Sequence, residues 1–219
     1  MSITIISATP SPYARINRIA LIEKGIPFKL QVTHPSPPSP NLTPLTNNPT
    51  QTEIPWHPDT QTPTHNPLEK LPVLLFSDGR APVYDSSHIQ RWIVTTYATR
   101  GPRLITGDVD TDLRLEQIQV LSQGVMDAVV LAFFEKAREA PSRSWWERQM
   151  RKVEGGFRAF EALAGERAGA GEGAFLVAGQ LTIADIAVGC AVGFVEFNGA
   201  LPGWRERFPR LSEYWARFG

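Results

Sequence analysis

The sequence contains a single cysteine, Cys190, so the chain cannot form an internal disulfide bond. It also lacks net charge, because 22 lysines and arginines balance 22 aspartates and glutamates. A neutral chain has no overall field to attract nucleic acid or an anionic membrane surface. No apolar run reaches the length expected of a membrane-spanning helix, and the first residues lack the basic region and long apolar core of a signal peptide. These absences predict a cytoplasmic protein whose partner is a small molecule or another protein.

The first part of the chain alternates extended and helical patterns. Residues 3–7 form a short apolar run, residues 13–24 carry apolar side chains at helical spacing, and residues 28–33 alternate apolar and polar side chains. Gly25 and Pro27 mark the end of the helix. A strand, a helix and a strand of these lengths predict a βαβ unit with two parallel strands.

The most informative stretch is residues 70–87, which joins an apolar strand, a tight Asp-Gly turn, a second short strand at 82–84 and a helix start. Asp85 and Ser86 stand where this helix begins. Unpaired N–H groups at a helix start carry partial positive charge and suit an anionic ligand. An ordinary capped helix start is the structural alternative, because aspartate and serine are preferred caps.

Residues 34–67 interrupt this pattern with a segment that is rich in proline, threonine and asparagine and contains no lysine or arginine. A structureless loop of this length is uncommon inside a compact domain. We therefore expect an irregular surface excursion that orders partly through Ile54 and Trp56. Its histidines follow no metal-ligand motif, so we expect no metal site there.

The rest of the chain is helical in pattern, which predicts an α/β domain at 1–100 and an all-helical domain at 108–219, with the boundary near a Gly-Pro pair. Thr182 and Asp185 form a capping pattern ahead of an apolar helix, which we expect to be buried at the centre of the second domain. Cys190 lies on this helix and is expected to be inert packing.

Several short motifs, in this order and at these separations, resemble those of the cytosolic glutathione transferase superfamily. They are Ser11-Pro12-Tyr13-Ala14-Arg15, Asn66-Pro67, Lys70-Leu71-Pro72-Val73-Leu74, Asp85-Ser86, Thr182-Ile183-Ala184-Asp185 and Phe208-Pro209-Arg210-Leu211. The S-P-Y-x-R start is similar to the serine-type classes, and the run D-A-V-V-L-A-F-F-E-K-A-R resembles a bacterial and fungal subgroup. The resemblance implies a thioredoxin-like domain that binds glutathione, an all-helical domain with a pocket for a hydrophobic electrophile, and a homodimer.

The resemblance also implies roles for individual residues. Leu71-Pro72 would be a cis peptide, and the backbone of Leu71 would pair with the cysteinyl group of glutathione. Asp85 and Ser86 would receive the γ-glutamyl end, and Lys70 the glycyl carboxylate. Aromatic candidates for the electrophile pocket are Phe133, Phe134, Trp145 and Trp204.

Ser11 is the residue that the chemistry favours for holding the glutathione sulfur. A free thiol has a pKa of about 8.5, so the thiolate must be stabilised at neutral pH. A hydroxyl just ahead of a helix can donate a charge-assisted hydrogen bond to a thiolate, and Arg15 would add positive potential. Thr9 and Tyr13 are rival donors, and a simple helix cap is the structural alternative for Ser11.

The leading hypothesis is a glutathione S-transferase that conjugates the glutathione thiolate to electrophilic hydrophobic small molecules, as in detoxification. The alternatives are a non-catalytic binding module of the same fold and a glutathione-dependent isomerase or dehalogenase. Two features depart from the resemblance. Residues 34–67 replace a short helix of the family, which would be lost or displaced, and Asn17 stands where an aliphatic or basic residue is usual.

Overall fold

The structure is a computed structural model of the chain, and it describes residues 2–31, 60–166, 175–177 and 179–217. The chain divides into two compact units, Met1–Pro102 and Arg103–Gly219. Most of the proline-rich segment, including Ile54 and Trp56, lies outside the described residues. Its last part forms the short helix α2 (Thr62–His65).

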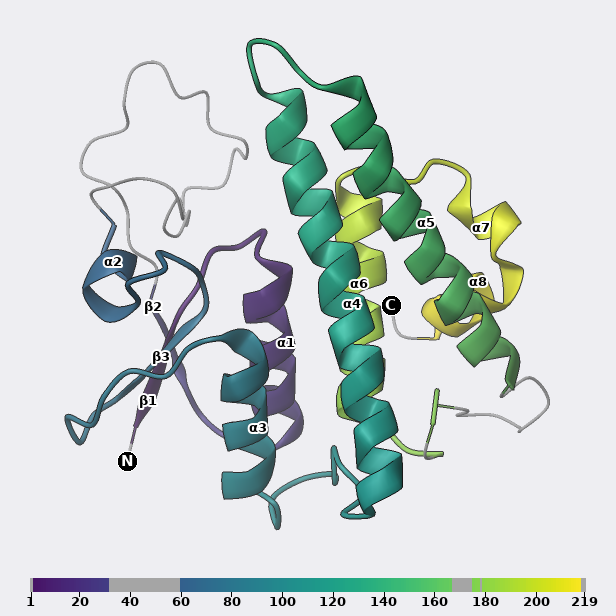
Figure 1. Ribbon diagram of the computed structural model, residues 1–219. Helices are drawn as coiled ribbons and strands as arrows, with labels where there is room; N and C mark the ends of the chain where they lie inside the picture. Colours follow the sequence, from purple (N-terminus) through teal and green to yellow (C-terminus); the bar gives the residue numbers. More distant parts are fainter. Residues whose placement is uncertain (1, 32–59, 167–174, 178, 218–219) are drawn as a thin grey trace. The chain divides into compact units, whose positions relative to one another are not determined.

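Three strands form the sheet of the first unit, β1 (Ile3–Ile6), β2 (Lys29–Gln31) and β3 (Val73–Phe76). Their order is β2-β1-β3, with β1 parallel to β2 and antiparallel to β3. The parallel pairing confirms the predicted βαβ unit. Figure 1 shows α1 (Pro12–Glu23) and α3 (Ser86–Thr96) together on one side of the sheet and α2 on the other.

The second strand predicted at residues 82–84 is reduced to a single bridge between Leu74 and Val83. These two residues exchange both backbone hydrogen bonds, each 2.9 Å long. In an antiparallel ladder the next such pair toward α3 would join Asp85 to Pro72, which has no N–H to donate. In the opposite direction β3 ends at Phe76 and the chain enters the turn. The ladder therefore cannot extend in either direction.

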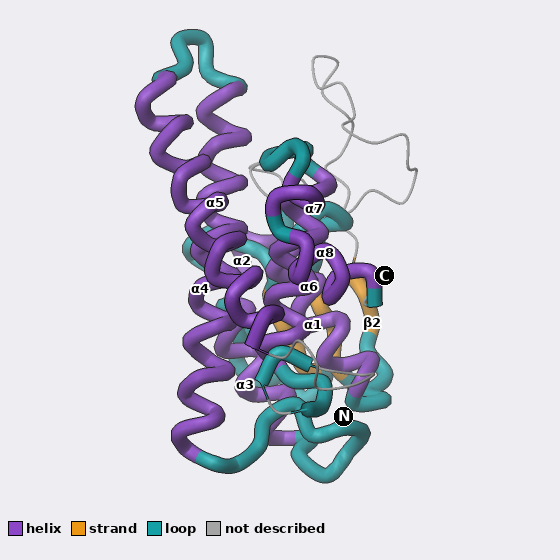
Figure 2. The backbone as a smooth tube through the Cα atoms, turned by 90° about the vertical axis from the view of Figure 1, so that its right-hand side faces the viewer, coloured by secondary structure: helices purple, strands orange, loops and turns teal. Residues whose placement is uncertain are grey.

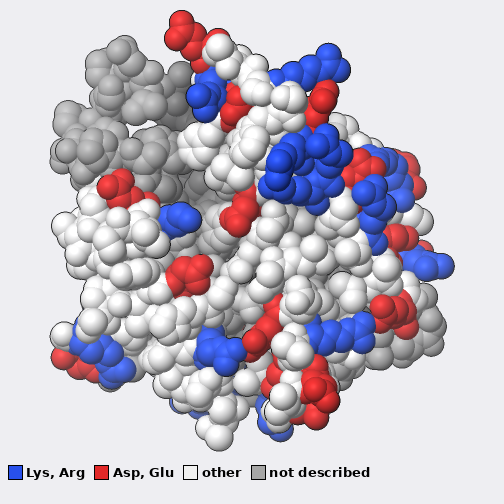
Figure 3. Space-filling model, viewed as in Figure 1, with Lys and Arg blue, Asp and Glu red and all other residues white. Residues whose placement is uncertain are grey.

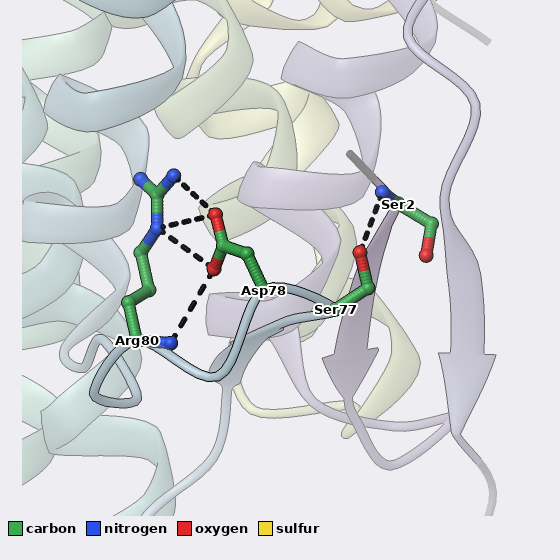
Figure 4. Close-up of polar contacts among 4 residues, drawn as sticks. All are labelled: Ser2, Ser77, Asp78 and Arg80. Carbon is green, nitrogen blue, oxygen red and sulfur yellow. Dashed lines mark hydrogen bonds and ion pairs between the residues drawn. The ribbon is translucent and has the colours of Figure 1, made fainter.

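The turn that follows β3 is held by local polar contacts (Figure 4). Gly79 has a φ of 78°, a conformation that glycine adopts without steric cost. Arg80 forms an ion pair with Asp78 at 2.6 Å, and the side-chain hydrogen bonds from Arg80 hold the pKa of the Asp78 carboxyl below its usual value. The Ser77 hydroxyl accepts a hydrogen bond from the N–H of Ser2 at 3.0 Å, which ties the turn to the start of β1.

The described part of the second unit is helical. Its helices are α4 (Val109–Lys136), α5 (Arg143–Glu166), α6 (Ile183–Phe197), α7 (Trp204–Arg207) and α8 (Pro209–Ala216). Figure 2 shows α4 and α5 as a long antiparallel pair joined by a loop, and α4 also packs against α6. Of the 15 residues of α6, 11 are buried, which confirms the predicted central helix.

Aromatic rings build part of the core of this unit around Phe157. The ring centroids of Phe160, Trp204 and Phe208 lie 6.0, 5.5 and 5.8 Å from that of Phe157. Trp204 is only 5% exposed. It therefore belongs to this aromatic core.

The start of α6 is organised by the fully buried Asp185. Its Oδ2 accepts hydrogen bonds from the N–H and the hydroxyl of Thr182, at 2.9 and 2.7 Å, which confirms the predicted capping pattern. Its Oδ1 accepts from the N–H of Leu176 at 2.8 Å and from the hydroxyl of Tyr214 at 2.9 Å. Burial, together with the charge of Asp185, raises the pKa of Tyr214. These contacts join three segments of the unit, so the role of Asp185 is structural.

Among the described residues, α4 is long and apolar enough to cross a membrane by length and composition alone. This corrects the expectation that no such run exists. Within the second unit, α4 packs against α5 and α6. Figure 3 shows side chains of both charges lying among one another on one face of the molecule, in keeping with the balanced composition.

Candidate functional site

Ser11 is the N-cap of α1. Its backbone is extended, and its Oγ accepts a hydrogen bond from the N–H of Ala14 at 3.2 Å. The cap uses only a lone pair of the hydroxyl, so the O–H remains able to donate. The side chain is half-buried, and Arg15 one turn later is exposed. Ser11 therefore combines a capping role with a donor at the positive end of a helix.

The rival donors Thr9 and Tyr13 flank Ser11. Thr9 is exposed in the turn that leads to α1, and Tyr13 is half-buried on the first turn of the helix. Both make further contacts within the protein. The choice of Ser11 over these two residues stays a prediction.

The peptide bond between Leu71 and Pro72 is cis, which confirms the expectation drawn from the resemblance. Leu71 lies two residues before Val73, which is the first residue of β3 and pairs with Ile6 of β1. The Leu71 side chain is buried, while its backbone lies beyond the end of the strand ladder. That backbone is where an extended peptide would pair.

Ser11 and Leu71 lie at the same end of the sheet. Because β1 and β3 are antiparallel and their ladder ends at the pair Ile6–Val73, the residues after β1 and those before β3 leave the sheet together. Leu71 belongs to one apolar cluster with Ala8, Ile6 and Val73. The carbonyl of Ala8 also accepts a hydrogen bond from the N–H of Ser11 at 3.0 Å.

A buried asparagine shapes the turn before the cis peptide. The side chain of Asn66 donates to the carbonyl of Lys70 at 2.8 Å and accepts from the N–H of Leu68 at 3.0 Å. Glu69 within this turn has a φ of 54°, and it is the one non-glycine residue in the described part of the chain with a positive φ. The turn leaves the Lys70 side chain exposed beside Leu71, where it can meet an anionic group.

Asp85 and Ser86 begin α3, as the sequence predicted. Asp85 is the N-cap, and its Oδ1 accepts from the N–H groups of Ser87 and His88 at 3.1 and 3.4 Å. The Asp85 side chain is exposed, and within the described chain its Oδ2 accepts no hydrogen bond. This oxygen can therefore accept one from a ligand.

Sequence reasoning missed a contact between α1 and α3. The side-chain Nδ2 of Asn17 donates to the backbone carbonyl of Ser86 at 2.8 Å, and both residues are buried. A polar side chain on the apolar face of α1 was the only sign of it in the sequence. The contact fastens the start of α3 to α1.

The remaining candidates lie in the second unit. Phe133 and Phe134 at the end of α4 and Trp145 at the start of α5 are each about two-fifths exposed, so their rings are available for apolar contact. The same unit contains a cleft of about 630 Å³ whose lining residues are mostly charged. Its lining residues are Glu154, Arg158, Glu161, Ala162, Arg207, Phe208 and Arg210. Within the described ranges no three His, Cys, Asp or Glu side chains gather to hold a metal ion.

Known protein families match both units of the chain. Residues 10–96 match the glutathione S-transferase N-terminal domain, and residues 143–217 match the glutathione S-transferase C-terminal domain. The chain is also 30% identical over 214 residues to the uncharacterized GST-like protein YibF of Escherichia coli K12, a match that covers 94% of this chain and 89% of YibF. The chain belongs to the glutathione S-transferase superfamily.

Solved glutathione S-transferases share the fold. One from Methylobacterium radiotolerans, in complex with glutathione sulfonate, is 39% identical with a TM-score of 0.81, over 100% of this chain and 90% of that one. Another from Methylobacillus flagellatus, with glutathione bound, is 26% identical with a TM-score of 0.80, over 98% and 93% of the two chains. The fold is thus that of the glutathione S-transferases, a thioredoxin-like α/β domain followed by a helical domain.

The match to the glutathione S-transferase N-terminal domain covers every residue predicted from the sequence for the glutathione site. Ser11 and Arg15 lie near its start, and Asp85 and Ser86 lie near its end. The assignment to the serine-type subgroup and the individual residue roles stay predictions.

Proposed function

We propose that the protein is a glutathione transferase that joins the sulfur of glutathione to an electrophilic carbon of a hydrophobic small molecule. The solved relatives support glutathione as the co-substrate, since one was crystallised with glutathione and another with glutathione sulfonate. A cytoplasmic location, a role in detoxification and a homodimeric state belong to the same proposal and rest on family membership.

The observation that carries the proposal is the gathering of Ser11, Leu71 and Asp85 around one end of the first unit. The bridge pairs Leu74 with Val83. Leu71 lies three residues before Leu74, and Asp85 lies two residues after Val83. In an antiparallel hairpin these positions leave the bridge in the same direction. The site thus offers a donor for sulfur, the backbone of Leu71 beyond the end of the strand ladder and a carboxylate, all on neighbouring segments.

The size of this arrangement supports a tripeptide ligand. The contact that fastens α3 to α1 is made at Asn17, which lies about 9 Å along the helix from Ser11 at 1.5 Å per residue. An extended tripeptide spans about 10 Å, which is of the same order. In the proposed complex, glutathione places its sulfur at Ser11, its γ-glutamyl ammonium and carboxylate at Asp85 and Ser86, and its glycyl carboxylate toward Lys70.

In the proposed reaction the glutathione thiol loses its proton to solvent, and the thiolate sulfur forms a bond to the electrophilic carbon. The leaving group departs with its bonding electron pair, or, in an addition, the substrate takes up a proton. Lowering the thiol pKa by two units requires about 2.7 kcal/mol of preferential thiolate stabilisation. The Ser11 hydroxyl donates one hydrogen bond to sulfur, and the positive end of α1 and Arg15 supply further stabilisation.

The test compares Ser11→Ala with the wild-type protein in conjugation of glutathione to an activated aryl chloride. A hydrogen bond to a charged group contributes about 1.5–3 kcal/mol, so kcat/KM should fall about 10- to 100-fold. The pH profile of kcat/KM should move to higher pH, because the bound thiol becomes less acidic.

Ser77→Ala is the matched control. The Ser77 hydroxyl also accepts a hydrogen bond from a backbone N–H in the same unit, but it has no proposed role in the site. Its activity should equal that of the wild type. Full activity in Ser11→Ala would refute the role of Ser11, and Thr9→Ala and Tyr13→Phe would then identify the donor.

Glutathione binding separates transferase activity from the alternatives. A protein that millimolar glutathione stabilises against heat, but that turns over no aryl or alkyl halide, would be a binding module or an isomerase. One that releases halide without leaving a glutathione conjugate would be a dehalogenase. A protein that glutathione does not stabilise at all would contradict the whole proposal.

A further inference from the structure

The helix α1 carries a polar side chain on its buried face. Asn17 is fully buried, beside the apolar residues Ile16, Ala20 and Leu21 of the same helix. Burying an amide is unfavourable unless both its donor and its acceptor find partners. An apolar side chain of similar size would avoid this cost, so packing alone does not account for Asn17.

Only half of the Asn17 amide is satisfied within the described residues. Its Nδ2 donates to the carbonyl of Ser86 at 2.8 Å, while its Oδ1 has no hydrogen-bond partner. One satisfied donor and one unsatisfied acceptor contribute little net stability. What the side chain does provide is a directional link between two helices.

The link acts on the start of α3. The carbonyl of Ser86 has two lone pairs, so it can accept from Asn17 in addition to its own helical hydrogen bond. Both helices carry buried apolar side chains, such as Ile16 on α1 and Ile93 on α3, and apolar packing is non-directional. A second polar link lies at the other end of α1, where the Nζ of Lys24 donates to the carbonyl of Pro102 at 2.7 Å. The Asn17–Ser86 bond therefore sets how the start of α3 sits against α1.

We propose that Asn17 is a positioning residue for glutathione. This inference rests on the proposed function. Asn17 does not touch the ligand, but it sets the spacing between Ser11 at the start of α1 and Asp85 and Ser86 at the start of α3. One glutathione molecule must meet both helix starts at once, so a shift of α3 along α1 weakens its binding and leaves the environment of the sulfur unchanged.

The experiment measures the KM for glutathione, kcat and the free energy of unfolding for Asn17→Leu and Asn17→Ala. Leucine fills the space of the asparagine and removes the unsatisfied Oδ1, so Asn17→Leu should be at least as stable as the wild type. Alanine leaves a cavity, so Asn17→Ala should be less stable. Both variants should raise the KM for glutathione about tenfold, the factor that corresponds to about 1.4 kcal/mol. At saturating glutathione, kcat should stay within about twofold of the wild type.

Asn198→Ala is the matched control, because the Nδ2 of Asn198 also donates to a backbone carbonyl, that of Phe194, at 2.8 Å in the second unit. It should lower stability and leave the KM unchanged. An unchanged KM in both Asn17 variants would overturn the inference and make Asn17 a purely structural residue. A fall in kcat without a rise in KM would also overturn it. A wild-type protein that does not bind glutathione would instead refute the proposed function, and the inference with it.

Discussion

The helices α3 and α6 both begin with an aspartate near the N-terminus, in opposite surroundings. At α6, Asp185 is fully buried, and each of its carboxylate oxygens accepts two hydrogen bonds. At α3, Asp85 is exposed, and its hydrogen bonds from the protein all go to Oδ1. A buried carboxylate is tolerated only when its lone pairs are satisfied, whereas an exposed one can keep an oxygen for a ligand.

The comparison separates a residue that holds the fold from one that can hold a substrate. The partners of Asp185 come from three segments of the second unit, so its bonds join parts that are distant in sequence. The partners of Asp85 are the next residues of its own helix. Asp185 therefore matters for the stability of a whole unit, while Asp85 matters for one helix start and for what binds beside it.

The largest effect is expected from Asp185→Ala. The substitution leaves four buried donors without their acceptor: the N–H groups of Leu176 and Thr182 and the hydroxyls of Thr182 and Tyr214. Unpaired buried donors cost about 1–3 kcal/mol each, so we expect the free energy of unfolding to fall by at least about 4 kcal/mol. Urea unfolding measures it, with Asp85→Ala as the control, where the loss of a cap costs about 0.5–2 kcal/mol. Equal losses in the two variants would show that Asp185 and Asp85 contribute equally to stability.

A smaller effect is expected from Tyr214→Phe, which removes one hydrogen bond to Asp185 and costs about 1.5–3 kcal/mol at neutral pH. The folded state raises the pKa of Tyr214 above 10.0, so its contribution to stability is complete below that pH. As the pH rises further, the unfolded chain loses the tyrosine proton and the folded chain keeps it, so stability falls. Unfolding measured between neutral and strongly alkaline pH should show a shallower fall in the variant. An unchanged slope would mean that folding does not raise the pKa of Tyr214.

At α3, Asp85→Asn tests whether the exposed aspartate binds glutathione. Asparagine caps a helix about as well as aspartate, so the free energy of unfolding should change by less than about 0.5 kcal/mol. The charge is lost, however, and the affinity for glutathione should fall about 10- to 100-fold, because hydrogen bonds to charged groups contribute about 1.5–3 kcal/mol. Isothermal titration calorimetry measures the affinity. An unchanged affinity would reduce Asp85 to an ordinary cap.

The smallest effect is expected from Glu69→Gly in the turn before the cis peptide. A positive φ costs an L-residue about 1–2 kcal/mol, while glycine loses about 0.5–1 kcal/mol through the greater freedom of the unfolded chain. The net result should be a gain in stability of about 0.5–1 kcal/mol. Thermal unfolding measures it, and a loss of stability would show that the Glu69 side chain makes a contact worth more than the backbone strain.

Local signals accounted for most of the elements. The helix α1 begins at a Ser-Pro cap and ends before a glycine with positive φ, as the sequence predicted, because caps and glycines act within a few residues. The prediction failed where the outcome depended on a partner strand. Residues 82–84 have the composition of a strand, but Pro72 across the hairpin has no N–H, and only the pairing at Leu74 survives.

Some residues of the candidate site could likewise be predicted from local signals, and others could not. Ser11, Asp85 and Ser86 could be found from the sequence because each is a helix-start residue beside a strand or turn signal. The cis peptide at Leu71–Pro72 followed only from the resemblance, since most X-Pro bonds are trans. The sequence showed Asn17 as a polar residue on the apolar face of α1, but it did not show that the partner of Asn17 would be Ser86.

The sequence by itself determined where α1, α3 and α6 begin, the parallel pairing of β1 and β2, and the buried position of α6. These depend on short-range caps, turns and apolar spacing. Only the tertiary structure decided that Asn17 reaches Ser86, 69 residues away, and that Asp185 reaches Tyr214, 29 residues away. Such contacts depend on how far one helix slides along another, which apolar periodicity does not specify and a directional hydrogen bond does.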